Sequence, residues 1–140
     1  MLYIPENFNA KEKSVYLKAL VYVLSLSGNN KIKNEYFLLQ LKKVGISEDK
    51  IEKGKPVCKI EALVDNIRSL ENLRIQRFII REMIMLAVAD QEVTDDEIRT
   101  IYQVAESAGI SSEKVGDFFI WAAKGIEWQL EGVQLIEEDL

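Results

Sequence analysis

The sequence predicts an all-α fold, built as a single compact domain of about seven helices. Proline and glycine are scarce, with two and seven among 140 residues, and no stretch alternates apolar and polar residues as a half-buried strand does. Apolar residues recur at helical spacing instead. A domain of this length buries roughly two-thirds of its unfolded surface, which is enough for a core without a metal or a disulfide.

Two segments are expected to form the central helices. Residues 11–26 are apolar on nearly all sides toward their end, and residues 73–89 repeat this pattern. Such a pattern is typical of a helix that other helices surround. The other predicted helices span residues 34–44, 48–52, 57–69, 95–108 and 112–130.

The start of one helix has a specific capping signal. Thr94 is a favourable N-cap, and Glu97 three residues later completes a capping box. Asp95 and Asp96 suit the positive end of the helix dipole. These residues predict a helix that begins just after Thr94.

The triplet Gly-Ile-Ser occurs twice, at residues 45–47 and 109–111. In each copy the glycine is expected to end one helix, the isoleucine to contact it, and the serine to cap the next. This recurrence indicates an internal repeat. Its degenerate copies cover about residues 11–55 and 73–130.

Charge is divided unevenly along the chain. Residues 1–59 hold 11 lysines and 6 acids, a net +5, whereas residues 60–140 hold 7 basic residues and 17 acids, a net −10. The acidic half could form a binding face, but solvated helix surfaces and an acidic tail at residues 137–139 are the commoner explanation. Overall acidity argues against nucleic acid as a partner.

A cytoplasmic location is expected. The single cysteine, Cys58, cannot form an internal disulfide, and the N-terminus lacks the features of a signal peptide. The longest apolar runs fall far short of the roughly 20 residues that span a bilayer, so no membrane span is predicted.

Residues 89–97 read Ala-Asp-Gln-Glu-Val-Thr-Asp-Asp-Glu, between an apolar helix and the second Gly-Ile-Ser. This segment resembles the TerB-like family of tellurite-resistance proteins, which includes the N-terminal region of DjlA-type co-chaperones. The resemblance implies an all-α fold of pseudo-duplicated helical hairpins and a bacterial protein linked to stress.

The resemblance also implies roles for particular residues. Asp90 matches the family's loop acid and Glu97 the acid at the start of the next helix, positions suspected of holding a cation. Gln91 replaces the family glycine and would be strained if the backbone there has positive φ. The first copy of the loop, residues 27–33, has amides in place of the acid and two lysines nearby, so no second cation site is expected there.

A divalent cation, Ca²⁺ or Mg²⁺, is the possible ligand of this acidic loop, because hard cations take several oxygen ligands. The candidate metal ligands are Asp90, Glu92, Asp95, Asp96 and Glu97. The spacing fails the EF-hand pattern, with Asp95 where glycine is needed and Ile101 where glutamate is needed. Helix capping explains the same acids without a metal, and we favour that explanation.

The residues for familiar kinds of catalysis are missing. The chain has no histidine, so neither a Ser-His nor a Cys-His pair can form. Cys58 is expected near the start of the helix at 57–69, where a small buried cysteine is the commoner case than a reactive one. We therefore do not expect an enzyme.

Two helix faces are candidates for binding. Arg74, Arg77 and Arg81 form one basic stripe, for which pairing within the protein is the favoured explanation. The last helix places aromatic residues on one face, with Gly125 permitting close approach. The candidate interaction residues are Phe118, Trp121 and Trp128.

These observations predict a non-enzymatic interaction module that binds a protein partner or forms a homodimer. The alternative is a domain that responds to a divalent cation through residues 90–97. An enzyme that uses carboxylates alone is a distant third.

Overall fold

The computed structural model describes residues 5, 8–28, 30–51 and 58–140, and within them the only regular structure is helical. This confirms the all-α class, with six α-helices and one 3-10 turn in place of about seven helices. They are α1 (Ala10–Leu26), α2 (Lys31–Lys43), the 3-10 turn η1 (Glu48–Lys50), α3 (Ile60–Arg68), α4 (Leu73–Ala87), α5 (Asp95–Ser107) and α6 (Ser112–Glu137).

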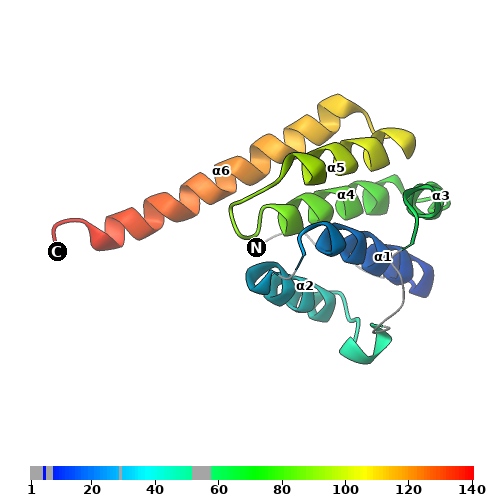
Figure 1. The fold of residues 1–140 in the computed structure, drawn as a ribbon, viewed down its shortest axis with the longest axis horizontal. Helices are drawn as coiled ribbons and strands as arrows, with labels where there is room; N and C mark the ends of the chain where they lie inside the picture. The colour runs from blue at the N-terminus through cyan, green and yellow to red at the C-terminus, as the bar shows by residue number, and fades with distance from the viewer. Residues whose placement is uncertain (1–4, 6–7, 29, 52–57) are drawn as a thin grey trace.

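The helices α1 and α4 lie side by side at the centre of the body (Figure 1). In addition, α4 contacts α2, α5 and α6, and α1 contacts α2, α3 and α5. Leu20 and Val23 of α1 and Ile79 and Met83 of α4 are completely buried. The predicted central position of both helices is confirmed, since an apolar surface on all sides requires neighbours on all sides.

Both Gly-Ile-Ser triplets end a helix in the same way. Gly45 and Gly109 have positive φ, 79° and 92°. The Ile46 N–H donates to the Leu41 carbonyl at 2.8 Å, and the Ile110 N–H donates to the Ala105 carbonyl, also five residues earlier, at 2.8 Å. These are Schellman motifs, which satisfy carbonyl groups at the helix end.

Several predicted boundaries were wrong. α2 begins three residues early because the Asn30 side chain caps it, accepting from Lys33 N at 3.0 Å. α3 begins only at Ile60, so Cys58 precedes the helix. The predicted end of the helix at 48–52 and the predicted start of the helix at 57–69 lie outside the described residues.

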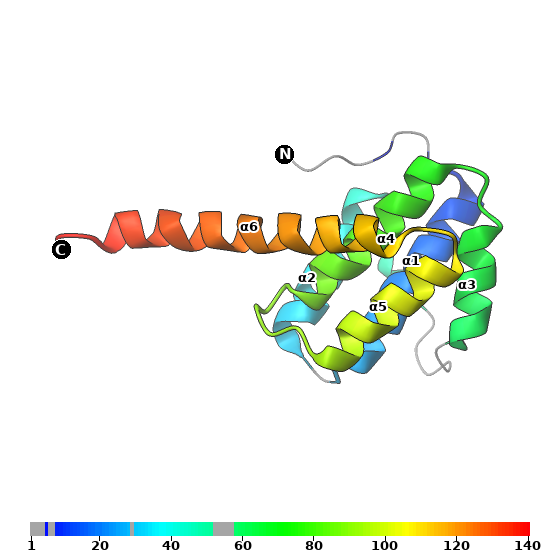
Figure 2. The same cartoon turned by 90° about the horizontal axis from the view of Figure 1, so that it is seen from above.

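The largest difference is the length of α6, which continues to Glu137, seven residues past the predicted end. Val115 and Ala122 are its buried residues, and beyond Ala122 the helix runs for about 22 Å at 1.5 Å per residue. Figure 2 shows this part extending beyond all other helices. No helix in the described ranges combines the length and the apolar character needed to cross a bilayer.

Candidate functional site

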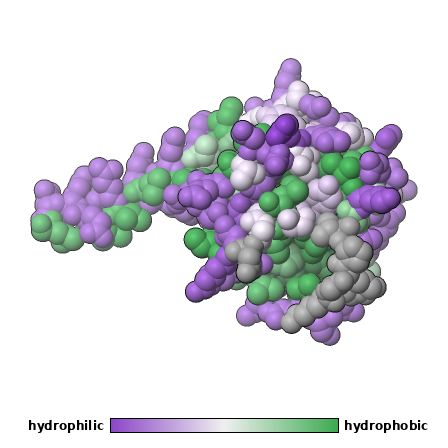
Figure 3. Space-filling view, viewed as in Figure 1, coloured by the Kyte–Doolittle hydropathy of each residue, from purple (hydrophilic) through white to green (hydrophobic). Residues whose placement is uncertain are grey.

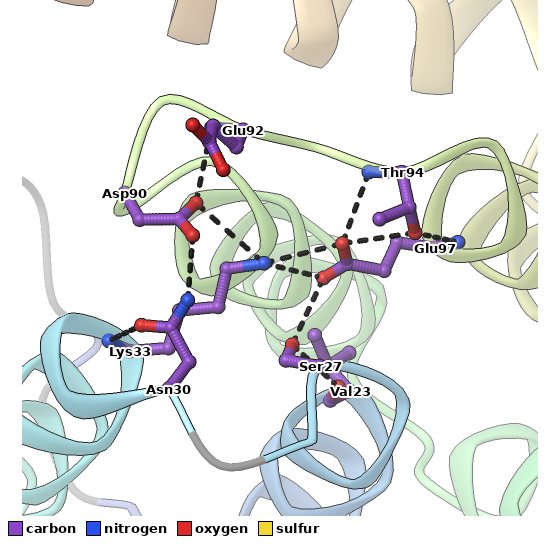
Figure 4. A network of polar contacts seen from close by, with 8 residues as sticks. All are labelled: Val23, Ser27, Asn30, Lys33, Asp90, Glu92, Thr94 and Glu97. Atoms are coloured by element: carbon purple, nitrogen blue, oxygen red, sulfur yellow. Dashed lines mark hydrogen bonds and ion pairs between the residues drawn. The ribbon is translucent and has the colours of Figure 1, made fainter.

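Lys33 lies at the point where the loop between α4 and α5 meets the start of α2 (Figure 4). Its ammonium nitrogen lies 2.9 and 3.1 Å from the two carboxylate oxygens of Glu97 and 3.6 Å from Asp90 Oδ1. The Lys33 and Glu97 side chains are 2% and 0% exposed. A buried ion pair therefore joins the two halves of the chain.

The Glu97 carboxylate is fully engaged by its neighbours. Oε1 accepts from the backbone N–H and the hydroxyl of Thr94, both at 3.0 Å. The Thr94 hydroxyl accepts in turn from Glu97 N at 3.1 Å, which confirms the predicted capping box. Oε2 accepts from the hydroxyl of Ser27 at the end of α1, at 3.1 Å. Together with Lys33, these donors satisfy the charge that burial would otherwise penalise.

Asp90 is held by the same junction. Its Oδ2 accepts from the Asn30 side-chain amide at 2.6 Å, and its Oδ1 from Glu92 N at 3.0 Å. Burial alone raises the pKa of Asp90, but these two hydrogen bonds and the Lys33 charge outweigh it and lower the pKa below its ordinary value. Asp90 is therefore a carboxylate stabilised in its charged form.

The carboxylates of the other three predicted metal ligands do not join this pair. Glu92, Asp95 and Asp96 are exposed, and Asp96 pairs with Arg99 at 2.6 Å. In the described part of the chain no three acidic or cysteine side chains converge as a metal site requires. The structure brings together two of the five candidates and leaves three on the surface.

The residues that meet do not fit a divalent cation. The Lys33 ammonium lies within ion-pair distance of both Asp90 and Glu97, where a cation bound by these two carboxylates would sit. A second positive charge there would be repelled by the first. The positive charge that these acids require is supplied by the chain itself.

Gln91 has a positive φ, which is the condition under which strain was predicted at this position. Its φ is 64°, close to the 65° of Gly28 in the other loop. A side chain with a Cβ occupies this region at a cost, whereas glycine does not. The loop is therefore strained at the position where this sequence departs from the glycine.

Sequence reasoning missed Lys33 and Ser27. A signal existed for the lysine, because it lies in the first turn of α2, where a positive charge opposes the helix dipole. A lysine in that place needs a compensating acid, but only the fold shows that the acid comes 64 residues later.

A second polar cluster is buried around Glu82 of α4. The Arg81 Nε donates to Glu82 Oε2 at 3.1 Å. The hydroxyls of Tyr16 and Tyr36 are buried without a hydrogen-bond partner among the described residues. Burial raises the pKa of Glu82 more than Arg81 and Lys43 lower it, and it raises the pKa of both tyrosines. Burial therefore disfavours the charged form of Glu82 despite its ion pair with Arg81.

The predicted arginine stripe is divided between two environments. Arg81 contacts Glu82, and its guanidinium lies 5.0 Å from the Phe78 ring centre and 5.5 Å from that of Trp121. Arg74 and Arg77 line a shallow surface hollow near the start of α1. The pairing of Arg81 with an acid on its own helix is as expected.

The three predicted interaction residues become more exposed along α6. Phe118 is half-buried against the core, Trp121 is 39% exposed and Trp128 is 74% exposed. Leu135, one further heptad along, is 69% exposed. The face that packs on the body at its start therefore becomes exposed farther along the helix.

A hollow of about 650 Å³ lies where α6 leaves the body. Trp121, Gly125 and Trp128 form its α6 side, and Tyr36 and Met85 are among the residues of the body side. A second hollow continues along the same helix, past Trp128 to Leu135 and Ile136. The apolar face and the two hollows make one continuous surface.

The fold and these surfaces define an all-helical domain with a buried ion pair and a projecting amphipathic helix. No family model, curated protein or solved structure matches the chain. Membership of the TerB-like family therefore stays a prediction based on residues 89–97.

Proposed function

We propose that this chain is a protein-interaction module whose docking surface is the projecting part of α6. We call this surface the α6 seam, which consists of Trp121, Gly125, Trp128, Gly132 and Leu135. The observation that carries the proposal is the 74% exposure of Trp128 on a helix that has left the body. Tryptophan is the residue type most often central to protein interfaces.

Leaving this surface in water is costly. Covering apolar surface gains roughly 25 cal/mol per Å², and a tryptophan or another aromatic residue covers about 150–250 Å² when fully buried. Hydrophobic side chains line one side of the projecting helix in Figure 3. Contiguous surfaces of this kind mark interaction sites in soluble proteins.

The acids of residues 90–97 support this function over catalysis or cation binding. Asp90 and Glu97 are held by Lys33 and by donors from three segments of the chain. Carboxylates so engaged stabilise the junction of the two loops. Their role is structural in this proposal.

A lipid surface fits the α6 seam poorly. Helices that lie on membranes carry lysine and arginine on the polar face, which anionic lipids attract. On the projecting part of α6 the charged residues are Glu127, Glu131 and Glu137 against the single basic residue Lys124. Their negative charge favours a protein surface over an anionic bilayer.

Site-specific photo-crosslinking in cells tests the proposal. A photoreactive phenylalanine analogue replaces Trp128 or, as a matched control on the same turn, Glu127. We expect the analogue at 128 to give a discrete crosslinked band at a protein partner, and the analogue at 127 to give little. Equal crosslinking at both positions, or none at 128, contradicts the proposal.

A further inference from the structure

The α6 seam alternates large and small residues with heptad spacing. Trp121, Trp128 and Leu135 lie seven residues apart, and so do Gly125 and Gly132. These two sets occupy the d and a positions of one heptad register. A Cβ built on either glycine meets no atom within 4 Å, so both positions are open notches beside large side chains.

This alternation selects one orientation for a pair of such helices. In a parallel pair, a faces a and d faces d. Tryptophan would then oppose tryptophan while glycine opposed glycine, giving overpacked layers next to voids. In an antiparallel pair, a faces d, so every layer combines one large residue with one glycine. Uniform layers pack better, because both voids and overpacking cost stability.

Resting on the proposed function, we propose that the α6 seam pairs with a second copy of this chain. The two helices run antiparallel about a two-fold axis that crosses the seam at the level of residue 130. Trp128 of each copy then fills the notch at Gly132 of the other, and Leu135 fills the notch at Gly125. Both contacts occur twice, as an isologous interface requires. The interface therefore has four layers, two of Trp128 with Gly132 and two of Leu135 with Gly125.

The hollow beside the body completes this interface. In the antiparallel pair the end of one α6 reaches the place where the other α6 leaves its own body. Leu135 and Ile136, 69% and 73% exposed, then lie at the hollow lined by Trp121 and Met85. The apolar end of the helix and the apolar hollow beside it are thereby covered together.

Charge is compatible with the antiparallel pair. Lys124 and the C-cap residue Glu138 occupy the same flanking position of the heptad, two heptads apart. Antiparallel pairing about this axis places Lys124 of each copy level with Glu138 of the other, giving two attractive pairs. Glu131 of one copy faces Glu131 of the other, which gives one repulsive pair. Attraction outnumbers repulsion in this arrangement.

The exposed apolar area of the α6 seam approaches that of a stable pair. Two exposed tryptophans, two exposed aliphatic residues and the stems of the flanking polar residues offer several hundred Å² on each copy. A standard interface covers roughly 800 Å² per partner. A pair joined by α6 and the two hollows approaches that size.

Sedimentation equilibrium of the full chain tests the pairing. We expect a species of twice the 16.1 kDa chain mass, and at least a tenfold weaker association for Trp128→Ala. Leu130→Ala is the matched control, since Leu130 is an apolar residue of α6 that is 50% exposed but lies away from the seam. Its association is expected to be unchanged.

Gly132→Leu tests the orientation, since it clashes with Trp128 of the other copy in the antiparallel pair but fills a void in a parallel one. Association weakened by this change supports the proposal, and association strengthened by it overturns the orientation. Glu131→Gln is expected to tighten the antiparallel pair at low salt, and Glu127→Gln to leave it unchanged.

The outcomes separate this inference from the proposed function. A monomer at all concentrations up to the millimolar range overturns the pairing. If the analogue at 128 still crosslinks to a different protein in cells, the interaction module stands with another partner. If the chain is monomeric and 128 gives no crosslink, both proposals are wrong.

Discussion

The ammonium of Lys33 lies 2.9 Å from Glu97 Oε2, with both side chains closed to solvent. The lysine begins α2 and the glutamate completes the capping box of α5, so one ion pair joins the two loops. Removing two charges from water is costly, and the pair is tolerated because hydrogen bonds satisfy the remaining oxygens. Loss of either partner leaves the other charge buried and uncompensated.

Lys33→Ala should therefore be strongly destabilising. We expect the free energy of unfolding to fall by about 3–5 kcal/mol, the usual loss when one partner of a buried pair is removed. Urea unfolding followed by circular dichroism measures this change. Lys31→Ala, which removes a lysine with an 89% exposed side chain, should cost less than about 1 kcal/mol.

The double variant Lys33→Met, Glu97→Gln removes both charges. Its loss should be smaller than the sum of the two single losses, since the charges of Lys33 and Glu97 are removed together and Asp90 keeps its hydrogen bonds from Asn30 and Glu92. Additive losses would show that the ion pair contributes nothing beyond the separate side chains.

Divalent cations should not stabilise the unmodified chain, because Lys33 supplies the charge that the acids require. Thermal unfolding of chelator-treated protein should show the same midpoint with and without millimolar Ca²⁺ or Mg²⁺. A rise of several degrees that disappears in the Asp90→Asn, Glu97→Gln variant would restore the cation-responsive alternative.

Glu82 should make stability fall as pH rises. Burial raises its pKa in the folded chain above the ordinary value of 4.5, so the unfolded chain loses this proton first. The folded state is then penalised from about pH 4.5 up through the raised pKa. Relative to the unmodified chain, Glu82→Gln should gain stability across that range in urea titrations at successive pH values. The same titration of Glu106→Gln, an exposed position of α5, controls for removal of a negative charge. If the difference in unfolding free energy between Glu82→Gln and the unmodified chain does not change with pH, the prediction is wrong.

Gln91→Gly should stabilise the loop before α5. Relief of the positive φ is worth roughly 1–2 kcal/mol, and the greater freedom of glycine in the unfolded chain offsets roughly 0.5–1 kcal/mol of it. A net gain of about 0.5–1 kcal/mol should be measurable by urea unfolding. Gln91→Ala retains the Cβ and should give no such gain, so equal effects of the two changes would argue against backbone strain.

Local features could be predicted from the sequence because they depend on neighbours along the chain. The capping box of Thr94 and Glu97 and the two Gly-Ile-Ser helix ends are complete within about six residues. The central positions of α1 and α4 follow from their apolar surfaces, which only surrounding helices can cover. Physical preferences of short segments determine all of these.

The candidate site could be predicted only in part. The charge and spacing of residues 90–97 predict a cluster of five acids, of which Asp90 and Glu97 do meet at Lys33 and the other three do not. Spacing along a helix does not show which oxygens converge, because that depends on the approach of another segment. The partner, Lys33, is 64 residues from Glu97.

The sequence by itself determined the helical class, the capping box of α5 and the aromatic repeat of α6, because each depends on residues within a few turns of one another. Only the tertiary structure decided that Lys33 compensates Glu97 and that Trp128 remains exposed. Both depend on where separate helices lie, since burial and ion pairing are properties of the space between segments.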